Sequence, residues 1–112
     1  MDTLRAEVFA PDLIWHLPGH HPLAGTKNGV DEVLAFFGKL RSLNIKVTPL
    51  GIGALNSGAV AEVYKGEGTY EGTPLNAFNC NHYLIKDGRI AEVQVLMADQ
   101  HGYDTFFNAA FG

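Results

Sequence analysis

The stretch 78–99, FNCNHYLIKDGRIAEVQVLMAD, decides the fold, because it reads as two long antiparallel strands joined at Asp87-Gly88. An Asp-Gly pair between two segments that mix apolar and polar residues is a strong signal for a β-hairpin. Both arms carry polar residues that a plain core strand does not need, so the face to which these point determines what the protein can do. They are Asn79, Asn81, His82, Glu92, Gln94 and Asp99.

The form of the turn sets the pairing of the two arms. With a two-residue turn, Asn81 pairs with Gln94; with a three-residue loop whose glycine is left-handed, Asn81 pairs with Val93 and His82 with Glu92. We predict the second register, because it sends His82 and Glu92 outward as a charge-matched pair. Its inner face is then a pocket wall, with Asp99 at its end, made of Asn79, Asn81, Tyr83, Val93, Val95 and Met97.

Length and composition indicate one globular domain over residues 1–112. The chain is 46% hydrophobic and only 18% charged, which gives it enough apolar surface for one core. Its net charge of −4 comes without any cluster of Lys or Arg, so no surface for nucleic-acid phosphates is expected. No segment is long and apolar enough to span a membrane.

Cys80 is the only cysteine, so no internal disulfide can form, and a reducing, cytoplasmic location is expected. The start of the chain lacks the basic and apolar blocks of a secretion signal.

Periodicity and turn residues predict the remaining elements. These are a short helix over 4–9, a strand over 13–17, a loop over 20–29, a helix over 30–41, strands over 45–55 and 59–70, a turn over 71–74 and a final helical turn after Asp99. Pro49 and Gly51 break the alternation of the strand over 45–55, which indicates a bulge or an edge position. The fold class is therefore α+β, with an antiparallel (mixed) sheet packed on helices. Glycines within the strands could let the sheet curl into a cone with a central pocket.

Three segments carry a resemblance to a known family: FAPDLIWHLPG at 9–19, PLAGTKNGVDEVLAFFGKL at 22–40 and NHYLIKDGRIAEVQVLMADQ at 81–100. Together they resemble the SnoaL-like and ketosteroid-isomerase-like branch of the nuclear-transport-factor-two-like superfamily, over residues 9–107. The resemblance implies a cone of curved sheet and helices, here with a shortened N-terminal helical region. It also implies a homodimer that forms through the outer face of the sheet.

The resemblance also bears on catalysis. It places Leu17 where ketosteroid isomerases carry a general-base aspartate, and Asn81 where they carry a protonated aspartate that binds the oxyanion. Leucine cannot move a proton, so a steroid-isomerase mechanism is not expected. In SnoaL-like cyclases an acid stands at the end of the last strand, and Asp99 is the nearest match.

The candidate catalytic residues are Asp99, Glu62 and His16, each with a plainer alternative. Asp99 can instead cap the C-terminal turn, Glu62 can face solvent or a partner, and His16 can be a structural histidine. The candidate substrate-binding residues are Trp15, Tyr64, Asn79, Asn81, Tyr83, Val93, Val95 and Met97. No cofactor is expected, and His16, His20 and His21 do not have the spacing of a metal site.

Three functions remain open at this point. The first is an acid–base enzyme, such as an isomerase, cyclase, dehydratase or hydrolase, that acts on a compact, largely apolar molecule. The second is a module that binds such a molecule without turning it over. The third is a dimeric interaction domain whose cone is filled by side chains. The first is our prediction, and a hollow that one acid enters would favour it.

Overall fold

A computed structural model describes residues 8–112 of the chain. Six strands form one sheet with the order β2-β1-β6-β5-β4-β3, and every neighbouring pair is antiparallel except the parallel pair β1 and β6. The elements in chain order are β1 (Phe9–Leu17), β2 (Gly25–Asn28), α1 (Val30–Arg41), β3 (Lys46–Ala54), β4 (Val60–Tyr70), β5 (Thr73–Lys86), β6 (Arg89–Met97) and α2 (Gln100–Phe111). This mixed sheet with two helices confirms the predicted α+β class.

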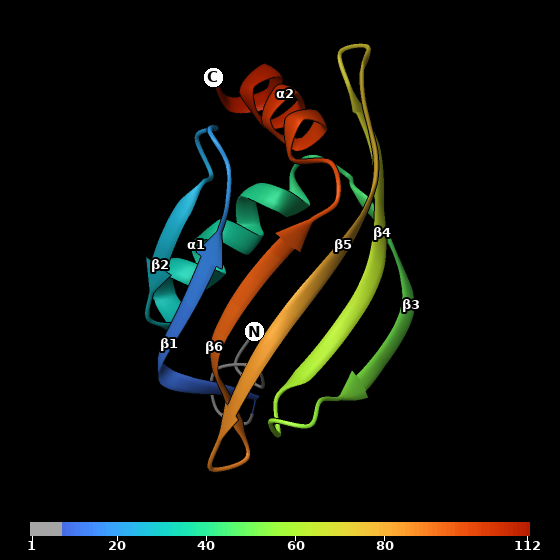
Figure 1. Cartoon of the computed structure of the whole chain (residues 1–112). Helices are drawn as coiled ribbons and strands as arrows, with labels where there is room; N and C mark the ends of the chain where they lie inside the picture. The colour runs from blue at the N-terminus through green and yellow to red at the C-terminus, as the bar shows by residue number, and fades with distance from the viewer. Residues whose placement is uncertain (1–7) are drawn as a thin grey trace.

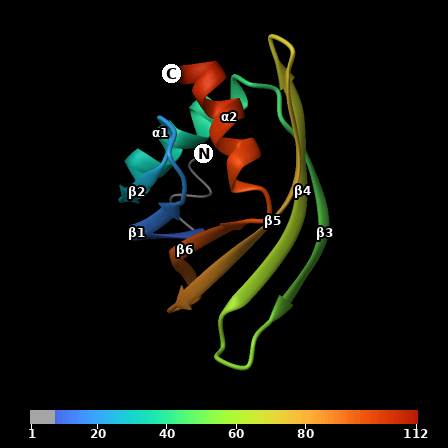
Figure 2. The same ribbon diagram turned by 45° about the horizontal axis from the view of Figure 1, so that its top comes forward.

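The sheet is curled but does not close on itself, and both helices lie on its concave side (Figures 1 and 2). Helix α1 packs on β1 and β2, and α2 packs on β4 and β5. The core fills the space between the helices and the inner face of the sheet. Its most deeply buried side chains are Leu13, Val33, Val93, Phe106 and Phe107.

Helix α1 forms where it was predicted. Its buried residues Val30, Val33 and Phe36 follow the helical period, and its acidic first turn and basic last turn complement the helix dipole. Gly29 precedes it at a φ of 85°, a left-handed conformation that favours glycine, and its amide donates to the carbonyl of Leu13 at 2.7 Å. This bond ties the start of the helix to β1.

The structure corrects several predicted boundaries. The segment 25–28, predicted as part of a loop, is strand β2 and pairs with β1. Thr73 and Pro74, predicted as turn residues, begin β5. The final turn is a full helix of 12 residues. The helix predicted over 4–9 lies outside the described residues except for Val8 and Phe9, and Phe9 begins β1.

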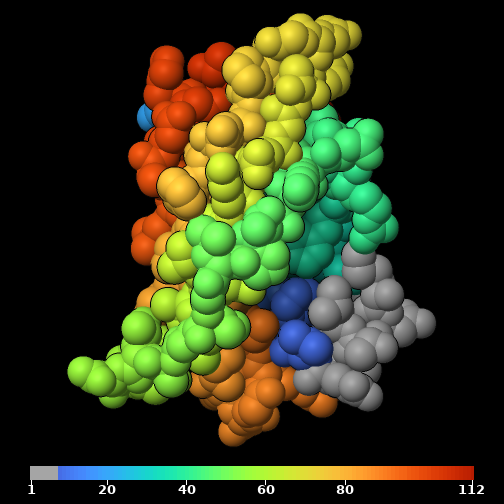
Figure 3. Space-filling model, turned by 90° about the vertical axis from the view of Figure 1, so that its right-hand side faces the viewer, coloured from blue at the N-terminus to red at the C-terminus, as the bar shows by residue number. Residues whose placement is uncertain are grey.

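The strand predicted over 45–55 is confirmed both as an edge strand and as a bulged one. Strand β3 ends the sheet, and its pairing with β4 shifts between Pro49 and Gly51. A bulge sharpens the local twist. Figure 3 shows this edge of the molecule, where β3 in green crosses the surface beside α1 in teal.

Candidate functional site

A cavity of about 440 Å³ lies between the inner face of the sheet and the two helices. Most of its wall is apolar, and its polar side chains are few. Because the lining residues Arg41 and Val47 are exposed, the cavity opens to solvent between the end of α1 and β3. Its lining residues are Trp15, Leu17, Phe36, Phe37, Leu40, Arg41, Ile45, Val47, Tyr64, Gly66, Asn79, Val95, Met97, Tyr103 and Phe107.

A chain of hydrogen bonds links Glu62 to the cavity wall. The Tyr83 hydroxyl donates to the Glu62 carboxylate at 2.8 Å, and the Asn81 amide donates to the Tyr83 oxygen at 3.0 Å. The Tyr64 hydroxyl in turn donates to the Asn81 carbonyl oxygen at 3.0 Å. Residues two apart on one strand share a face, as do Glu62 and Tyr64 on β4, and Asn81 and Tyr83 on β5. The pairing of Glu62 with Asn81 brings these four side chains together.

The carboxylate of Glu62 sets the direction of this chain. A carboxylate only accepts hydrogen bonds, so Tyr83 must donate to it and is left to accept from Asn81. The amide of Asn81 then offers its oxygen to Tyr64. Tyr64 therefore presents an oxygen lone pair, rather than its proton, to any molecule in the cavity.

The tyrosines of this region stay protonated at neutral pH. Burial raises the pKa of Tyr83 to about 12, opposed by the hydrogen bond from Asn81 and supported by the one to Glu62. Burial also raises the pKa of Tyr64 and, with a smaller opposing effect of Asn79, that of Tyr103. The hydroxyls of Tyr64 and Tyr103, which line the cavity, can therefore orient a ligand oxygen, and none of the three tyrosines serves as a base near pH 7.

Two residues of the cavity wall each carry one inaccessible polar atom that has no hydrogen-bond partner among the described residues. These atoms are the indole Nε1 of Trp15 and the side-chain oxygen of Asn79. Trp15 is 7% exposed and Asn79 is 4% exposed, so bulk solvent does not satisfy either group. The amide nitrogen of Asn79 donates to the hydroxyl of Tyr103 on α2.

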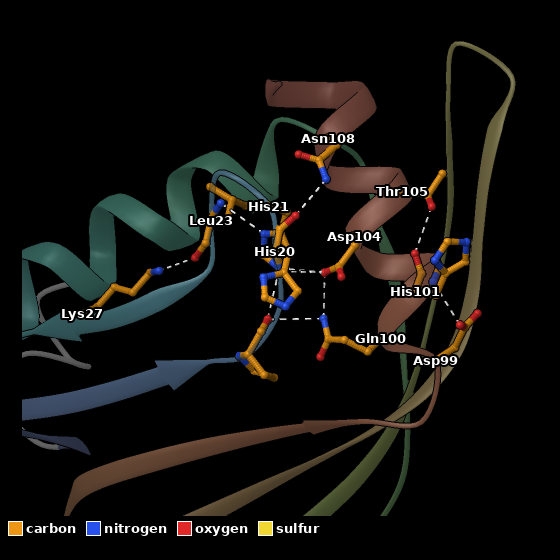
Figure 4. Close-up of polar contacts among 12 residues, drawn as sticks. His20, His21, Leu23, Lys27, Asp99, Gln100, His101, Asp104, Thr105 and Asn108 are labelled. Carbon is orange, nitrogen blue, oxygen red and sulfur yellow. Dashed lines mark hydrogen bonds and ion pairs between the residues drawn. The ribbon is translucent and has the colours of Figure 1, made fainter.

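The loop before β2 holds α2 over the cavity. The amide of His20 donates to the Asp104 carboxylate at 3.1 Å, and the Asn108 side chain donates to the carbonyl of His20 at 2.9 Å (Figure 4). The amide of Gln100 donates to Asp104 at 2.9 Å and to the carbonyl of Pro18 at 3.3 Å. Helix α2 supplies Tyr103 and Phe107 to the cavity, so these contacts fix one of its walls.

His21 lies at the centre of this contact, with its side chain fully buried. Its ring packs on Phe107 with centroids 4.7 Å apart. Nδ1 accepts from the amide of Leu23 at 3.2 Å and Nε2 donates to the carbonyl of Pro18 at 3.2 Å, which is the pattern of a neutral ring. Burial lowers the pKa of His21, opposed by the Pro18 carbonyl and the Asp104 carboxylate. His21 is thus a structural group of the loop.

The predicted site residues divide by position. Trp15, Tyr64, Asn79, Val95 and Met97 line the cavity, whereas Asn81, Tyr83 and Glu62 stand behind Tyr64 in the hydrogen-bonded chain. Val93 is fully buried in the core.

The other two candidate catalytic residues lie away from the cavity. Asp99 is exposed and caps α2 by accepting from the amide of Gly102 at 2.9 Å, which is the alternative role considered for it. His16 lies on the outer face of β1. Its Nε2 is 2.5 Å from the Glu92 carboxylate and its Nδ1 is 3.0 Å from the Thr26 hydroxyl.

The predicted hairpin register is wrong, although the predicted inner face is right. Asp87 and Gly88 form a two-residue turn in which both have positive φ, 54° and 77°. The register then shifts beside Leu84, and Asn81 pairs with Val95 instead of Val93. The observed register differs from the predicted one by two residues, an even number, so the same side chains face inward. His82 pairs with Gln94, and Glu92 meets His16 instead.

Sequence reasoning missed the helical part of the wall. Phe36, Phe37 and Leu40 of α1 and Tyr103 of α2 line the cavity, yet the sequence shows them only as residues of a helical apolar stripe. The spacing of that stripe predicts a buried face and does not distinguish a filled core from a hollow one.

The comparisons with known proteins agree with this architecture. The family model of the SnoaL-like domain matches residues 2–93, so the chain belongs to the SnoaL-like family. It is similar to a solved protein of unknown function with a cystatin-like fold from Xanthomonas campestris. The two are 30% identical, the match covers 95% of this chain and 84% of that one, and the TM-score is 0.82.

Two further relatives share the fold or the sequence. Bal32a, from a soil-derived mobile gene cassette, is 24% identical over 90% of this chain and 79% of its own, with a TM-score of 0.85. An uncharacterised protein of Mycobacterium tuberculosis is 29% identical over 104 residues, which are 90% of this chain and 79% of the relative.

Two findings concern other kinds of site. Within residues 8–112, no helix is long and apolar enough to cross a membrane. The same residues contain no group of three or more His, Cys, Asp and Glu side chains placed to hold a metal ion.

Proposed function

We propose that the protein binds a compact, largely apolar molecule in the cavity between the sheet and the helices. The observation that carries this proposal is the cavity itself, whose volume of about 440 Å³ lies in the range of small-molecule sites. Aromatic and aliphatic side chains would bury the body of the ligand. Tyr64, Asn79 and Tyr103 would orient its oxygen atoms.

The family and one neighbour of the same fold are consistent with this proposal. TerC, whose structure was determined in co-crystals with polyporic acid, has a TM-score of 0.76 to this chain at 17% identity. At that identity the likeness extends to the fold alone. The ligand of this chain therefore has to be argued from its own cavity.

Calorimetric titration with 2-naphthol tests the binding proposal. Val95→Phe fills part of the cavity and is expected to weaken binding at least tenfold, whereas Gln94→Phe, on the opposite face of the same strand, leaves it unchanged. Equal affinities for both variants, or no binding by the wild type, would contradict the proposal.

A second candidate function is acid–base turnover of the bound molecule with Glu62 as the base. The hydrogen bond between Glu62 and Tyr83 favours it, because this is a half-buried carboxylate connected to the cavity wall by hydrogen bonds. Glu62 stands behind Tyr64 and does not line the cavity, so this function requires a ligand that enters past Tyr64 and brings the carbon beside its carbonyl to the carboxylate. Glu62 would then take a proton from that carbon, and solvent would return a proton to the resulting enolate.

Incubation of 2-tetralone in deuterated buffer tests this second function by NMR. The wild type is expected to speed deuterium incorporation beside the carbonyl, and Glu62→Gln is expected to lose the effect. Glu67→Gln, on the outer face of the same strand, serves as the control. Incorporation at the buffer rate with the wild type would exclude this activity for an apolar ketone.

A cytoplasmic location of the protein stays a prediction. We also propose that the protein forms a homodimer through the outer face of the sheet. Val63, Cys80 and Leu96 are paired neighbours on three adjacent strands, and Phe78 follows on β5. Phe78 is 54% exposed and Leu96 is 52% exposed. A second copy placed on this patch would remove a continuous apolar surface from water.

A further inference from the structure

Three polar side chains meet on the outer face of the sheet, away from the cavity. Thr26 on β2 pairs with His16 on β1. Glu92 on β6 pairs with Ile14, two residues before His16. The Nδ1 of His16 is 3.0 Å from the Thr26 hydroxyl, and its Nε2 is 2.5 Å from the Glu92 carboxylate. Trp15, the next residue back along β1, lines the cavity, so the sheet separates the two sites.

The carboxylate of Glu92 sets the direction of these hydrogen bonds. A carboxylate only accepts, so in the neutral imidazole Nε2 carries the proton and donates to Glu92. Nδ1 of His16 then holds a lone pair, and the Thr26 hydroxyl donates to it. A hydroxyl that donates to an imidazole held by a carboxylate is the arrangement of an activated nucleophile, with Thr26 as the nucleophile and His16 as its base.

The backbone of β2 adds a donor beside the Thr26 hydroxyl. In an antiparallel pair, the amides of one strand point alternately toward the partner strand and away from it. The amide of Gly29 donates to Leu13 of β1. The amide of Asn28 donates to the side chain of Glu32 instead. Thr26, two residues before Asn28, therefore points its amide toward the open edge of the sheet, where an oxyanion on its side chain can accept from it.

We propose that Thr26, His16 and Glu92 form a second site, which hydrolyses esters of small carboxylic acids. Thr26 and His16 are its catalytic residues, and Glu92 is a positioning residue that fixes the tautomer of His16. The site is accessible, because Thr26 is exposed and His16 is half-buried. The acid is small, because the open edge of a sheet does not enclose a long acyl chain. The patch proposed for the dimer is centred on β5, three strands from β2.

The reaction proceeds through an acyl-threonine. The Thr26 oxygen bonds to the ester carbonyl carbon while Nδ1 of His16 takes the hydroxyl proton. The bond from that carbon to the alcohol oxygen then breaks, and the alcohol leaves with the proton from His16. Water attacks the acyl-threonine in the same way: it gives a proton to His16, and the acid leaves as the Thr26 oxygen regains that proton.

Hydrolysis of p-nitrophenyl acetate by the whole protein at pH 8 tests the proposal. We expect Thr26→Val, which keeps the shape of the side chain without its hydroxyl, and His16→Gln to lower kcat/KM at least tenfold. Thr26→Ser, which keeps a hydroxyl, is expected to retain activity. The matched controls are Thr69→Val, at an exposed position of β4, and His82→Gln, at a half-buried position of β5, and both are expected to keep the wild-type rate.

Two further measurements separate this mechanism from reactions at unrelated side chains. Acid quenching followed by digestion and mass spectrometry is expected to find an acetyl group on Thr26 in the wild type and none there in His16→Gln. Glu92→Gln is expected to lower kcat with little change in KM. Long-range nitrogen–proton NMR of this variant is expected to show that His16 no longer holds a single tautomer with the proton on Nε2.

Thermal unfolding separates catalysis from a structural tie between β1, β2 and β6. A structural tie predicts that Thr26→Val melts at a lower temperature and hydrolyses the ester as fast as the wild type. The proposal expects the opposite, because valine suits a strand and only the hydroxyl reacts.

The contrary results are distinct. A rate unchanged in Thr26→Val and His16→Gln, acetyl groups on lysines but not on Thr26, or a wild-type rate no greater than that of free imidazole at the same concentration would overturn the proposal. The acetyl map of the wild type requires no substitution, so it decides the question even where a variant unfolds.

Discussion

At Gly66 the absence of a side chain decides how closely α2 approaches the sheet. A Cβ atom there would lie 2.6 Å from the hydroxyl oxygen of Tyr103. Sequence reasoning expected the strand glycines to serve as bending points. At Gly66 the structure shows a different requirement, because the hydroxyl of a residue that is remote in sequence occupies the space of the missing side chain.

Gly66→Ala is therefore expected to destabilise the protein by about 1–3 kcal/mol, since a packed tyrosine must move to make room. Gly53→Ala is the matched control, because a Cβ at Gly53 meets nothing within 4 Å. Urea unfolding of both variants measures the difference. Equal stabilities would show that Tyr103 yields freely and that the close approach is not needed.

The polar residues on the inner face show how far sequence reasoning extends at this scale. Alternation alone places Asn79 and Asn81 on the same face as Tyr83, and that placement is correct. The roles of Asp99 and His16 could not be read in the same way. Asp99 caps α2 because the helix begins directly after it. His16 contacts Glu92 because β1 pairs with β6, a pairing between segments remote in sequence.

At the scale of elements, the β5–β6 hairpin shows why register is hard to predict. The Asp-Gly signal located the turn correctly, but Ala91 is an extra residue on β6 between the pairs Ile85–Ile90 and Leu84–Glu92. The pairing of β6 with β1 is irregular opposite the same segment, between Phe9 and Ile14. A bulge set by two neighbouring strands leaves no mark in the sequence of the hairpin itself.

The loop that carries His21 makes the attachment of α2 sensitive to pH. Burial lowers the pKa of His21 below its ordinary 6.5, so the folded state binds the proton more weakly than the unfolded state. This contribution to stability is complete above pH 6.5 and is lost as pH falls from there toward the folded pKa. The charged groups that act on the ring are Asp104, Lys27 and His20.

We therefore expect the melting temperature of the wild type to fall between pH 7 and pH 5 more steeply than that of His21→Gln. Glutamine can still donate and accept but does not titrate in this range. His101→Gln, at an exposed position, should retain the wild-type slope. Burial acts to raise the pKa of Asp104, but hydrogen bonds from Gln100 and His20 lower it overall. The stability that the Asp104 carboxylate contributes is therefore lost only at a lower pH than that of His21. Parallel slopes for the wild type and His21→Gln would contradict this account.

At the scale of the whole molecule, the sequence predicted a curled sheet with helices on one side, and the structure has this arrangement (Figure 2). It could not predict whether the cone is hollow, because apolar side chains that fill a core and those that line a cavity follow the same pattern. Phe36 and Phe37 of α1 and Tyr64 of the sheet line this hollow.

Assembly belongs to the same scale. The proposed dimer predicts that Phe78→Asp yields a monomer in analytical ultracentrifugation, because a charge would be buried in the apolar patch. Ile85→Asp is the control, since Ile85 is 43% exposed and lies close to the β5–β6 turn. A monomeric wild type at high micromolar concentration, or a Phe78→Asp variant that stays dimeric, would rule out this interface.

The central claim is that the cavity binds a compact, largely apolar molecule, and Trp15, the only tryptophan of the chain, lines that cavity. Because there is one indole N–H, a two-dimensional nitrogen–proton NMR spectrum contains a single indole signal that reports on the cavity wall. Titration with 2-naphthol is predicted to shift this signal in a saturable manner, because a ring bound against Trp15 changes the surroundings of its indole. An indole signal that stays in place while the ligand is added to saturation would contradict the account.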